Sequence, residues 1–387
     1  MRRPIFFFLA LLFFGLDGHT YPSFVSYGYK SCVTCHYNPQ GNGPLNDYGR
    51  ALFASEISSR RFAKPNETDE DLADRSGFFG MKTLPRWLRP HMKARLLLLE
   101  ENPGGPADKI SLIPMQADAG TTLVFDAQQR FLLVATASYF PTPRALANAE
   151  GGQRPSNFIS RETYFRWNPI KPLFLSLGLM DKVFGLRIAD HTAVSRAQTG
   201  FGVNDQAHGL AIQYMEKNWE LTVHPFVGNL FQDSDLRQKG ASVMFETDFD
   251  EKARVGGSVL SSQNAFIAWN RLAVHGKIGY RGKNSFLAEV GGIHNKAKTS
   301  DPTLGVYALI ENLGHFARGY NVISQFEYLN ETASTKSPDQ LRWTLGLLMF
   351  PAPRYEVRTT IVNSRIQSDS GVSEDQWLIQ AQLHLSL

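Results

Sequence analysis

The sequence has little cysteine, little surplus charge and, beyond its N-terminus, no long hydrophobic run. Cys32 and Cys35 are its only cysteines, so a zinc site built from two cysteine pairs is excluded. Lysine and arginine number 40 against 36 aspartates and glutamates, and this near balance gives no indication of nucleic-acid binding. After the N-terminus no segment approaches 18 uncharged apolar residues, which argues against a helical membrane protein.

Recognisable catalytic motifs are also missing. We find no Ser/His/Asp arrangement, phosphate-binding loop or paired-carboxylate motif in a usable context. The histidines after residue 100 are scattered, and no two have the spacing of a metal site. An enzyme is therefore the less favoured interpretation, although these absences do not exclude one.

The first 20 residues have the pattern of a secretory signal peptide. Arg2 and Arg3 supply the positive region, and residues 4–16 form an apolar run that is shorter than the roughly 20 residues of a membrane span. Cleavage is expected after Gly18 or Thr20. An uncleaved anchor is the alternative, and both interpretations predict export.

From about residue 91 to the end, apolar and polar residues alternate with a period of two. In the last segment Trp377, Ile379 and Leu383 share one face, whereas Gln380 and His384 share the other. Alternation of this kind directs one row of side chains into an apolar medium and the other into a polar one. The negative mean hydropathy is compatible with a transmembrane barrel, in which only alternate residues face lipid.

Short and long links alternate between these segments, as turns and loops do in bacterial outer-membrane barrels. Short links are expected at residues 126–130, 168–171, 217–218, 248–251, 281–284, 312–315 and 351–353. Long links are expected at residues 102–117, 141–157, 181–207, 228–239, 296–303, 330–339 and 364–374. One link, at 261–265, is short where a long one is due. The polar segment 187–206 is long enough to fold inward as a pore constriction.

These patterns predict an all-β fold, a transmembrane antiparallel β-barrel of about 16 strands over residues 91–387. Residues 56–90 read as a linker with a short helix, and residues 21–55 as a separate segment. An even strand number leaves both barrel ends, and the segment before the first strand, on the periplasmic side. A soluble, secreted β-sandwich is the alternative, because soluble sheets also alternate.

The motif Cys32-Val-Thr-Cys35-His36 has the form of a c-type haem attachment site. Its two thiols would bind the haem vinyl groups, and His36 would ligate the iron from the proximal side. A disulfide between Cys32 and Cys35 is the alternative, although the strand–helix–strand setting of a thioredoxin-like pair is missing.

The surrounding residues strengthen the haem interpretation. The motif is followed by Asn38-Pro39, a glycine-rich turn with Gly41 and Gly43, and an Asn-x-Tyr-Gly-Arg sequence at 46–50. This stretch of about 30 residues resembles the N-terminal monohaem cytochrome c segment of exported proteobacterial proteins, in which it precedes an outer-membrane porin-like barrel. The resemblance implies one covalent haem c at Cys32, Cys35 and His36, and electron-transfer or porin-like roles.

The second iron ligand is open at this point. His19, Met81, His91 and Met92 are the candidates on the same side of the membrane, and His19 lies near the cleavage site. A histidine would lower the reduction potential, and a methionine would raise it.

The leading functional hypothesis is a porin-like outer-membrane barrel with a haem on the periplasmic side, which exchanges electrons with periplasmic or multihaem cytochromes. A transport pore gated through its haem is a second hypothesis. A soluble periplasmic haem enzyme with a β-rich domain is the third. Outer-membrane lipid is an expected partner in the first two, and the oligomeric state is open.

Overall fold

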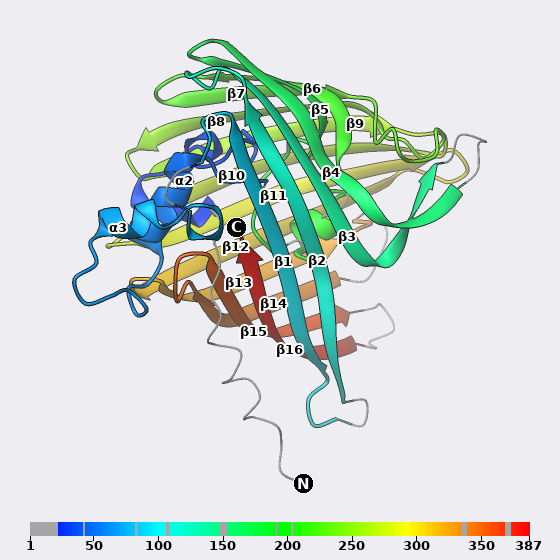
Figure 1. Cartoon of the computed structure of the whole chain (residues 1–387). Helices are drawn as coiled ribbons and strands as arrows, with labels where there is room; N and C mark the ends of the chain where they lie inside the picture. Colours follow the sequence, from blue (N-terminus) through cyan, green and yellow to red (C-terminus); the bar gives the residue numbers. More distant parts are fainter. Residues whose placement is uncertain are drawn as a thin grey trace.

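The computed structural model describes residues 22–41, 43–81, 84–105, 108–147, 153–190, 192–202, 205–333, 339–367 and 373–387. Its main feature is a closed antiparallel barrel of 16 strands, in which each strand pairs with its neighbours in sequence and β1 closes on β16 (Figure 1). The predicted fold class and strand number are therefore confirmed, and the β-sandwich alternative is wrong. The expected signal peptide lies outside the described residues.

The strands are β1 Leu88–Glu101, β2 Lys109–Val124, β3 Phe131–Ala147, β4 Gln153–Ile170, β5 Leu173–Met180, β6 Ala207–Met215, β7 Trp219–Phe226, β8 Lys239–Asp250, β9 Ala253–Gln263, β10 Ile267–Tyr280, β11 Asn284–Ala297, β12 Thr303–Ala317, β13 Tyr320–Asn330, β14 Asp339–Met349, β15 Tyr355–Gln367 and β16 Ser373–Ser386.

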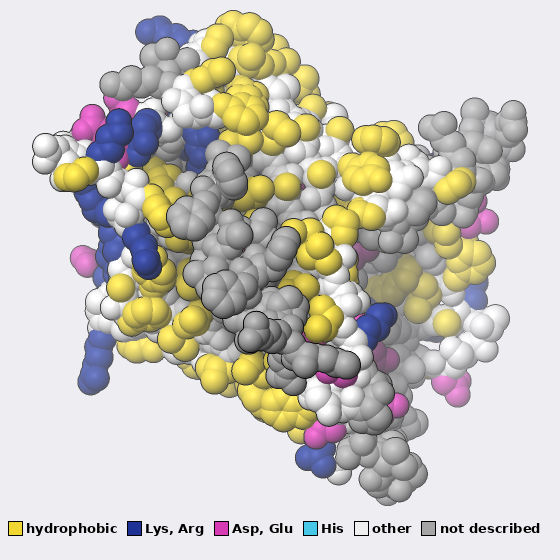
Figure 2. All heavy atoms as spheres, turned by 60° about the horizontal axis from the view of Figure 1, so that its bottom comes forward, with side chains coloured by type: hydrophobic (Ala, Val, Ile, Leu, Met, Phe, Trp, Pro, Cys, Tyr) yellow, Lys and Arg dark blue, Asp and Glu magenta, His cyan; other side chains and the backbone are white. Residues whose placement is uncertain are grey.

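The barrel is apolar outside and polar inside. On β10, Leu272 and Val274 are 56% and 59% exposed, whereas Arg271, His275 and Lys277 are buried. Figure 2 shows hydrophobic side chains spread over the outer surface and lysines and arginines gathered at the left, where α3 lies in Figure 1. This inverted distribution is that of a barrel whose outer face meets lipid.

The alternation of short and long links is also confirmed. Short turns close one end of the barrel, for example between β4 and β5 and between β12 and β13, and the long links lie at the other end. The β9–β10 link is short, as predicted. The strands β2, β3 and β4 extend further into the links at 102–117 and 141–157 than expected, because their hydrogen-bonded pairing continues where the alternation weakens.

Before β1 the described residues form short helices: η2 Pro22–Tyr27, η3 Cys32–Thr34, α2 Asp47–Leu52, η4 Phe53–Ile57, α3 Asp69–Asp74 and η5 Phe78–Gly80. A further one, α4 Val194–Ala197, lies between β5 and β6. Within the described ranges no helix has the length and apolar character to cross a membrane.

Residues 22–60, here called the plug segment, lie inside the barrel near its short-turn end. Polar contacts join the segment to lumen-facing residues on strands around the circumference: Lys93 on β1, Arg166 on β4, Glu220 on β7, Asp248 on β8 and Glu311 on β12. A segment that touches the inner face of so many strands occupies the lumen. The sequence predicts only a segment on the periplasmic side of the barrel, and its position within the lumen is not predicted.

The link 181–206, here called the inner loop, also folds into the lumen. Its Gly185 amide donates to Ser258 on β9 (2.9 Å), and its Thr199 and Thr192 carbonyl oxygens accept from Arg271 on β10 and Arg342 on β14. The predicted inward folding is thereby confirmed. Together the inner loop and the plug segment fill much of the space that an empty 16-stranded barrel leaves to water.

Candidate functional site

The Cys-x-x-Cys-His motif forms a single turn of 3-10 helix that Asn46 holds in place. The Asn46 side chain donates to the carbonyl oxygens of Val33 (3.2 Å) and Thr34 (3.1 Å), and accepts from the Gly49 amide (2.8 Å) as the N-cap of α2. Its backbone amide donates to the Cys35 carbonyl oxygen (2.8 Å). Asn46 therefore joins the cysteine turn to the helix that follows.

Glycines of the same stretch permit close packing around the cysteines. A Cβ on Gly49 would lie 2.3 Å from the Cys35 carbonyl oxygen, and one on Gly41, where φ is +71°, would lie 3.2 Å from the Cys32 sulfur. Gly43, with φ +62°, passes so close to β4 that a Cβ would lie 2.4 Å from a Glu162 oxygen. The glycine-rich turn is thus required by the approach of the chain to itself and to the wall.

The residues on either side of the motif bind the barrel wall. Before it, the Ser31 hydroxyl donates to Glu220 on β7 (3.0 Å). After it, the Asn38 amide donates to Glu162 on β4 (3.2 Å). Both carboxylates are buried, and the two anchors fix the position of the motif in the lumen.

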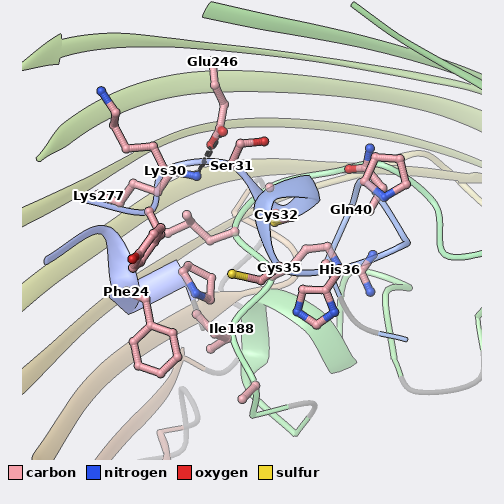
Figure 3. Close-up of a pocket in the computed structure, with 18 of the residues that line it drawn as sticks. Phe24, Lys30, Ser31, Cys32, Cys35, His36, Gln40, Ile188, Glu246 and Lys277 are labelled. Carbon is pink, nitrogen blue, oxygen red and sulfur yellow. Dashed lines mark hydrogen bonds and ion pairs between the residues drawn. The ribbon is translucent and has the colours of Figure 1, made fainter. Parts of the chain in front are cut away.

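A cavity lies between the motif, the inner loop and the wall (Figure 3). Its empty volume is about 1200 Å³, open solvent included. In Figure 3 the two cysteines lie between Lys30, Lys277 and Glu246 on one side and His36 and Gln40 on the other. The other lining residues are Pro22, Phe24, Tyr29, Ser31, Pro39, Gly41, Leu52, Arg95, Arg161, Gly185, Leu186, Arg187, Ile188, Ala189, Arg196, Glu220 and Met244.

The lining combines apolar side chains with a surplus of cations. Six lysines and arginines line the cavity, against two glutamates. Four of the six contact carboxylates: Lys277 contacts Glu246 (2.9 Å), Lys30 contacts Asp248 (2.6 Å), Arg161 contacts Asp118 (3.2 Å) and Arg187 contacts Asp181. Arg196 binds backbone carbonyl oxygens, including that of Ile188 (2.7 Å). The lining is therefore partly apolar and partly cationic, with most of the positive charge already paired.

The two cysteines are not joined in a disulfide. Burial raises the pKa of the Cys32 thiol to about 11 and that of the Cys35 thiol to about 12. A redox-active dithiol depends on a lowered thiol pKa, so these surroundings argue against a thioredoxin-like pair. The described residues also contain no group of three or more His, Cys, Asp or Glu side chains that could hold a metal ion directly.

The residues fit a covalently attached haem. Two unbonded thiols face one cavity with the required spacing, Gly41 leaves space beside the Cys32 sulfur, and His36 lines the same cavity. The cationic side chains would suit the two propionate groups of a haem, and Phe24 and Ile188 would suit its apolar ring.

The second-ligand candidates from the sequence do not line this cavity. His91 is buried beside β3, where its Nε2 lies 2.9 Å from the Thr136 hydroxyl, and it lines a different, smaller pocket. Met81 and Met92 are 51% and 40% exposed. His19 lies outside the described residues.

The sequence analysis missed Met244, which lines the cavity from β8. The pattern of β8 carries a signal for it: Met244 stands between Ser242 and Glu246 on the buried, lumen-facing row, where polar residues predominate. An apolar side chain in that row marks a place where the lumen is filled by something other than water.

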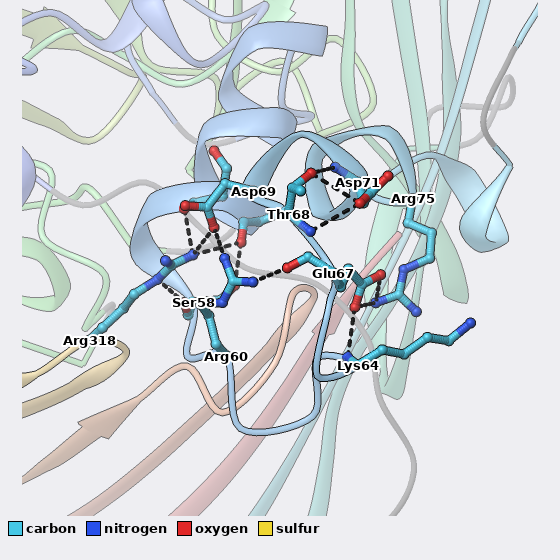
Figure 4. A network of polar contacts seen from close by, with 11 residues as sticks. Ser58, Arg60, Lys64, Glu67, Thr68, Asp69, Asp71, Arg75 and Arg318 are labelled. Carbon is cyan, nitrogen blue, oxygen red and sulfur yellow. Dashed lines mark hydrogen bonds and ion pairs between the residues drawn. The ribbon is translucent and has the colours of Figure 1, made fainter.

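A polar network ties the end of the plug segment and α3 to the barrel rim (Figure 4). Arg318, on the turn between β12 and β13, donates to the Ser58 carbonyl oxygen (2.8 Å) and contacts Asp69 (3.1 Å). Arg60 contacts the same Asp69 carboxylate (2.6 Å). One arginine of the barrel thus fastens two parts of the N-terminal region.

No protein-family model and no curated protein matches the sequence. Among solved structures, the chain is similar to OmpT of Vibrio cholerae expressed in the outer membrane (TM-score 0.58, 9% identity, 78% of this chain and 97% of that one). It is also similar to the outer membrane channel DcaP of Acinetobacter baumannii (0.57, 9%, 80% and 99%) and to Pseudomonas putida OprB at high pH (0.59, 11%, 78% and 94%). The chain therefore has the fold of the porin-like barrels of bacterial outer membranes.

Proposed function

We propose that this chain is an outer-membrane barrel that carries one covalent c-type haem in its lumen and takes part in electron transfer at the cell envelope. The observation that carries the proposal is the enclosure of Cys32, Cys35 and His36 in a cavity lined by both the plug segment and the barrel. The fold supports the membrane location, because the outer face is apolar and the inner face polar.

Each residue of the motif has a defined task in this proposal. The Cys32 and Cys35 thiols add across the two vinyl groups, so that each sulfur bonds to one carbon and each thiol hydrogen goes to the other. His36 ligates the iron. Asn46 and Gly49 hold the turn that presents these three side chains, and the cations of the inner loop and wall would bind the propionates.

The site exchanges electrons at one end of the barrel only. The hydrocarbon layer is about 30 Å thick, too far for direct transfer through one haem. The plug segment lies near the short-turn end, which in outer-membrane barrels faces the periplasm. The electron partner would therefore be a periplasmic cytochrome, or a multihaem cytochrome that extends the path.

A haem-stained gel together with a pyridine haemochrome spectrum of the outer-membrane fraction tests the proposal. We expect a stained band at the size of this chain, and a thioether-type spectrum that is lost in the double variant Cys32→Ala/Cys35→Ala. His91→Ala is the matched control, since His91 lies in a different pocket and its loss should leave covalent haem intact. Unstained protein, or protein absent from this fraction, would contradict the proposal.

The lumen position of the plug segment also favours a second candidate, a pore that its haem gates. The segment would then have to move for a solute to pass. Single-channel recording with and without reductant separates the two functions: conductance that rises or falls on reduction favours gating. A conductance that ignores reductant, with rapid haem reduction by a periplasmic cytochrome, favours electron transfer.

A further inference from the structure

An iron held by His36 has a second axial position, and the cavity restricts which side chain can fill it. The inference below rests on the proposed function, because it concerns the haem that the motif would bind. Axial ligands of protein haems are histidine, methionine, cysteine and tyrosine. Among the residues that the structure describes, the cavity lining offers two such side chains besides the motif itself, Tyr29 and Met244.

Tyr29 is poorly suited to this role. A tyrosine ligates iron as phenolate, and burial together with the nearby Glu56 carboxylate raises the pKa of Tyr29 above its ordinary value. Its hydroxyl also lies 3.4 Å from a Glu56 oxygen, which disfavours a negative charge there. The lysines of the lining are paired with carboxylates, Lys30 with Asp248 and Lys277 with Glu246.

Met244 is suited to it by position and by chemistry. It is 9% exposed and belongs to the lumen-facing row of β8, two residues before Glu246. The first cysteine is held against the same part of the wall: Ser31 donates to Glu220 on the neighbouring β7, and Glu220 and Glu246 both act electrostatically on the Cys32 thiol. A thioether is neutral, so it ligates iron without first losing a proton.

We propose that Met244 of the barrel wall is the second axial ligand of a haem attached to the plug segment. The iron would then be bound from both sides by different parts of the chain, by His36 in the plug segment and by Met244 in β8. This bond would fasten the plug segment to the barrel and raise the reduction potential of the haem relative to a histidine-ligated one.

The test uses the full-length protein purified from membranes, with the variants Met244→Leu, Met244→His and Met215→Leu. Leucine keeps the volume of methionine and removes the sulfur. Met215 is the matched control, because its sulfur lies 4.0 Å from the Ser31 hydroxyl yet does not line the cavity. The readouts are covalent haem per chain, the far-red absorption band of ferric methionine-ligated haem, the midpoint potential and carbon monoxide binding.

We expect the wild type and Met215→Leu to show the far-red band and to bind carbon monoxide weakly. Met244→Leu should keep its covalent haem, lose the band, bind carbon monoxide stoichiometrically and titrate at a lower potential. Met244→His should also lose the band and show a bis-histidine spectrum at a lower potential. Folding of each variant is checked by the change in its gel mobility on heating. If Met244→Leu does not fold, Met244→His provides the test of the assignment.

A wild type that carries covalent haem without the band, a Met244→Leu protein that retains it, or a Met215→Leu protein that loses it would overturn the assignment of Met244. Each of these results would leave covalent attachment at Cys32 and Cys35 intact. A wild type without covalent haem would instead overturn the proposed function, and the ligand assignment with it.

Discussion

At the scale of single residues, Asn46 has two separable tasks. Its side-chain oxygen caps α2, and its side-chain nitrogen binds the Val33 and Thr34 carbonyl oxygens of the cysteine turn. An N-cap contributes about 1 kcal/mol, and a hydrogen bond of this kind about 1 kcal/mol. Asn46 thus stabilises both the cysteine turn and the helix that follows it.

Substitution of Asn46 should therefore loosen the plug segment in two steps. Asn46→Ser keeps a good N-cap and loses the donors to the turn, whereas Asn46→Ala loses both. We expect the free energy of local opening to fall by about 1–2 kcal/mol in the serine variant and by about 1 kcal/mol more in the alanine variant. Native-state proteolysis of the plug segment measures this opening. Equal effects of the two substitutions would show that the cap contributes nothing.

Replacement of Gly49 by alanine has two opposing effects on stability. Alanine is favoured over glycine in a helix by about 1 kcal/mol, so propensity alone predicts that Gly49→Ala stabilises α2. The structure predicts the opposite, because the new Cβ would lie 2.3 Å from the Cys35 carbonyl oxygen. Overpacking of this kind costs about 1–3 kcal/mol. We expect lower covalent haem content and faster proteolysis of the plug segment in Gly49→Ala.

Gly292→Ala is the matched control for that variant, because nothing lies within 4 Å of a Cβ at this position on β11. It should leave haem content and proteolysis unchanged. A Gly49→Ala protein that is more resistant to proteolysis than the wild type would show that helix propensity outweighs the contact with Cys35.

At the scale of elements, an ion pair joins α2 to the start of β1. Arg89 donates three hydrogen bonds of 2.8–3.0 Å to Asp47, and Arg50 contacts the same carboxylate (3.2 Å). Burial opposes the charge on Asp47, but the two arginines outweigh it and hold its pKa below the ordinary 3.8. A carboxyl whose pKa is depressed in the folded protein stabilises it above the ordinary pKa, and this stabilisation disappears as the pH falls through the folded value.

The attachment of α2 to the barrel should accordingly weaken only in acid. We expect the plug segment to become more sensitive to an acid-active protease as the pH falls from about 5 to below the ordinary Asp47 pKa, and Asp47→Asn to abolish this dependence. Asp126→Asn is the control, since Asp126 lies on the β2–β3 turn, where it pairs with Arg130 (2.9 Å). An Asp47→Asn protein with the wild-type pH profile would assign the transition to another group.

The strands could be predicted from the sequence because alternation is a local property. On β16, Trp377 and Ile379 are exposed on the outer face and His384 is buried on the inner face, as the period of two predicts. The filling of the lumen could not be predicted in the same way, because it depends on contacts between residues far apart in sequence. The signal was nevertheless present: Leu309, Leu313 and Ile323 stand on lumen-facing rows, and Leu313 and Ile323 pack against Phe24 and Phe53 of the plug segment.

The candidate site likewise has a part that is local in sequence and a part that depends on distant residues. Cys32, Cys35 and His36 form a contiguous motif whose chemistry is readable from its spacing. A second ligand from a distant strand leaves no spacing to recognise, so the candidates His91 and Met81 rest only on their expected position on the same side of the membrane as the motif. The structure brings Met244 to the cavity and leaves those two outside it.

At the scale of the whole molecule, two segments of the chain lie inside the barrel. A 16-stranded barrel leaves an aqueous channel when it is empty, and here the plug segment and the inner loop lie in that space. We expect planar-bilayer recordings of the native protein to show low conductance, and deletion of residues 22–80 to raise it several-fold. Shortening the link between β7 and β8, which lies at the long-loop end, is the control. Equal conductance of native and deleted chains would show that the plug segment does not obstruct the lumen.

The intact mass of the folded, membrane-extracted protein tests the central claim most directly, because covalent haem adds its full mass to the chain. The account predicts the mass of the processed polypeptide plus one haem, and the mass of the polypeptide alone when both Cys32 and Cys35 are replaced by alanine. A wild-type barrel with the mass of its polypeptide alone would contradict it.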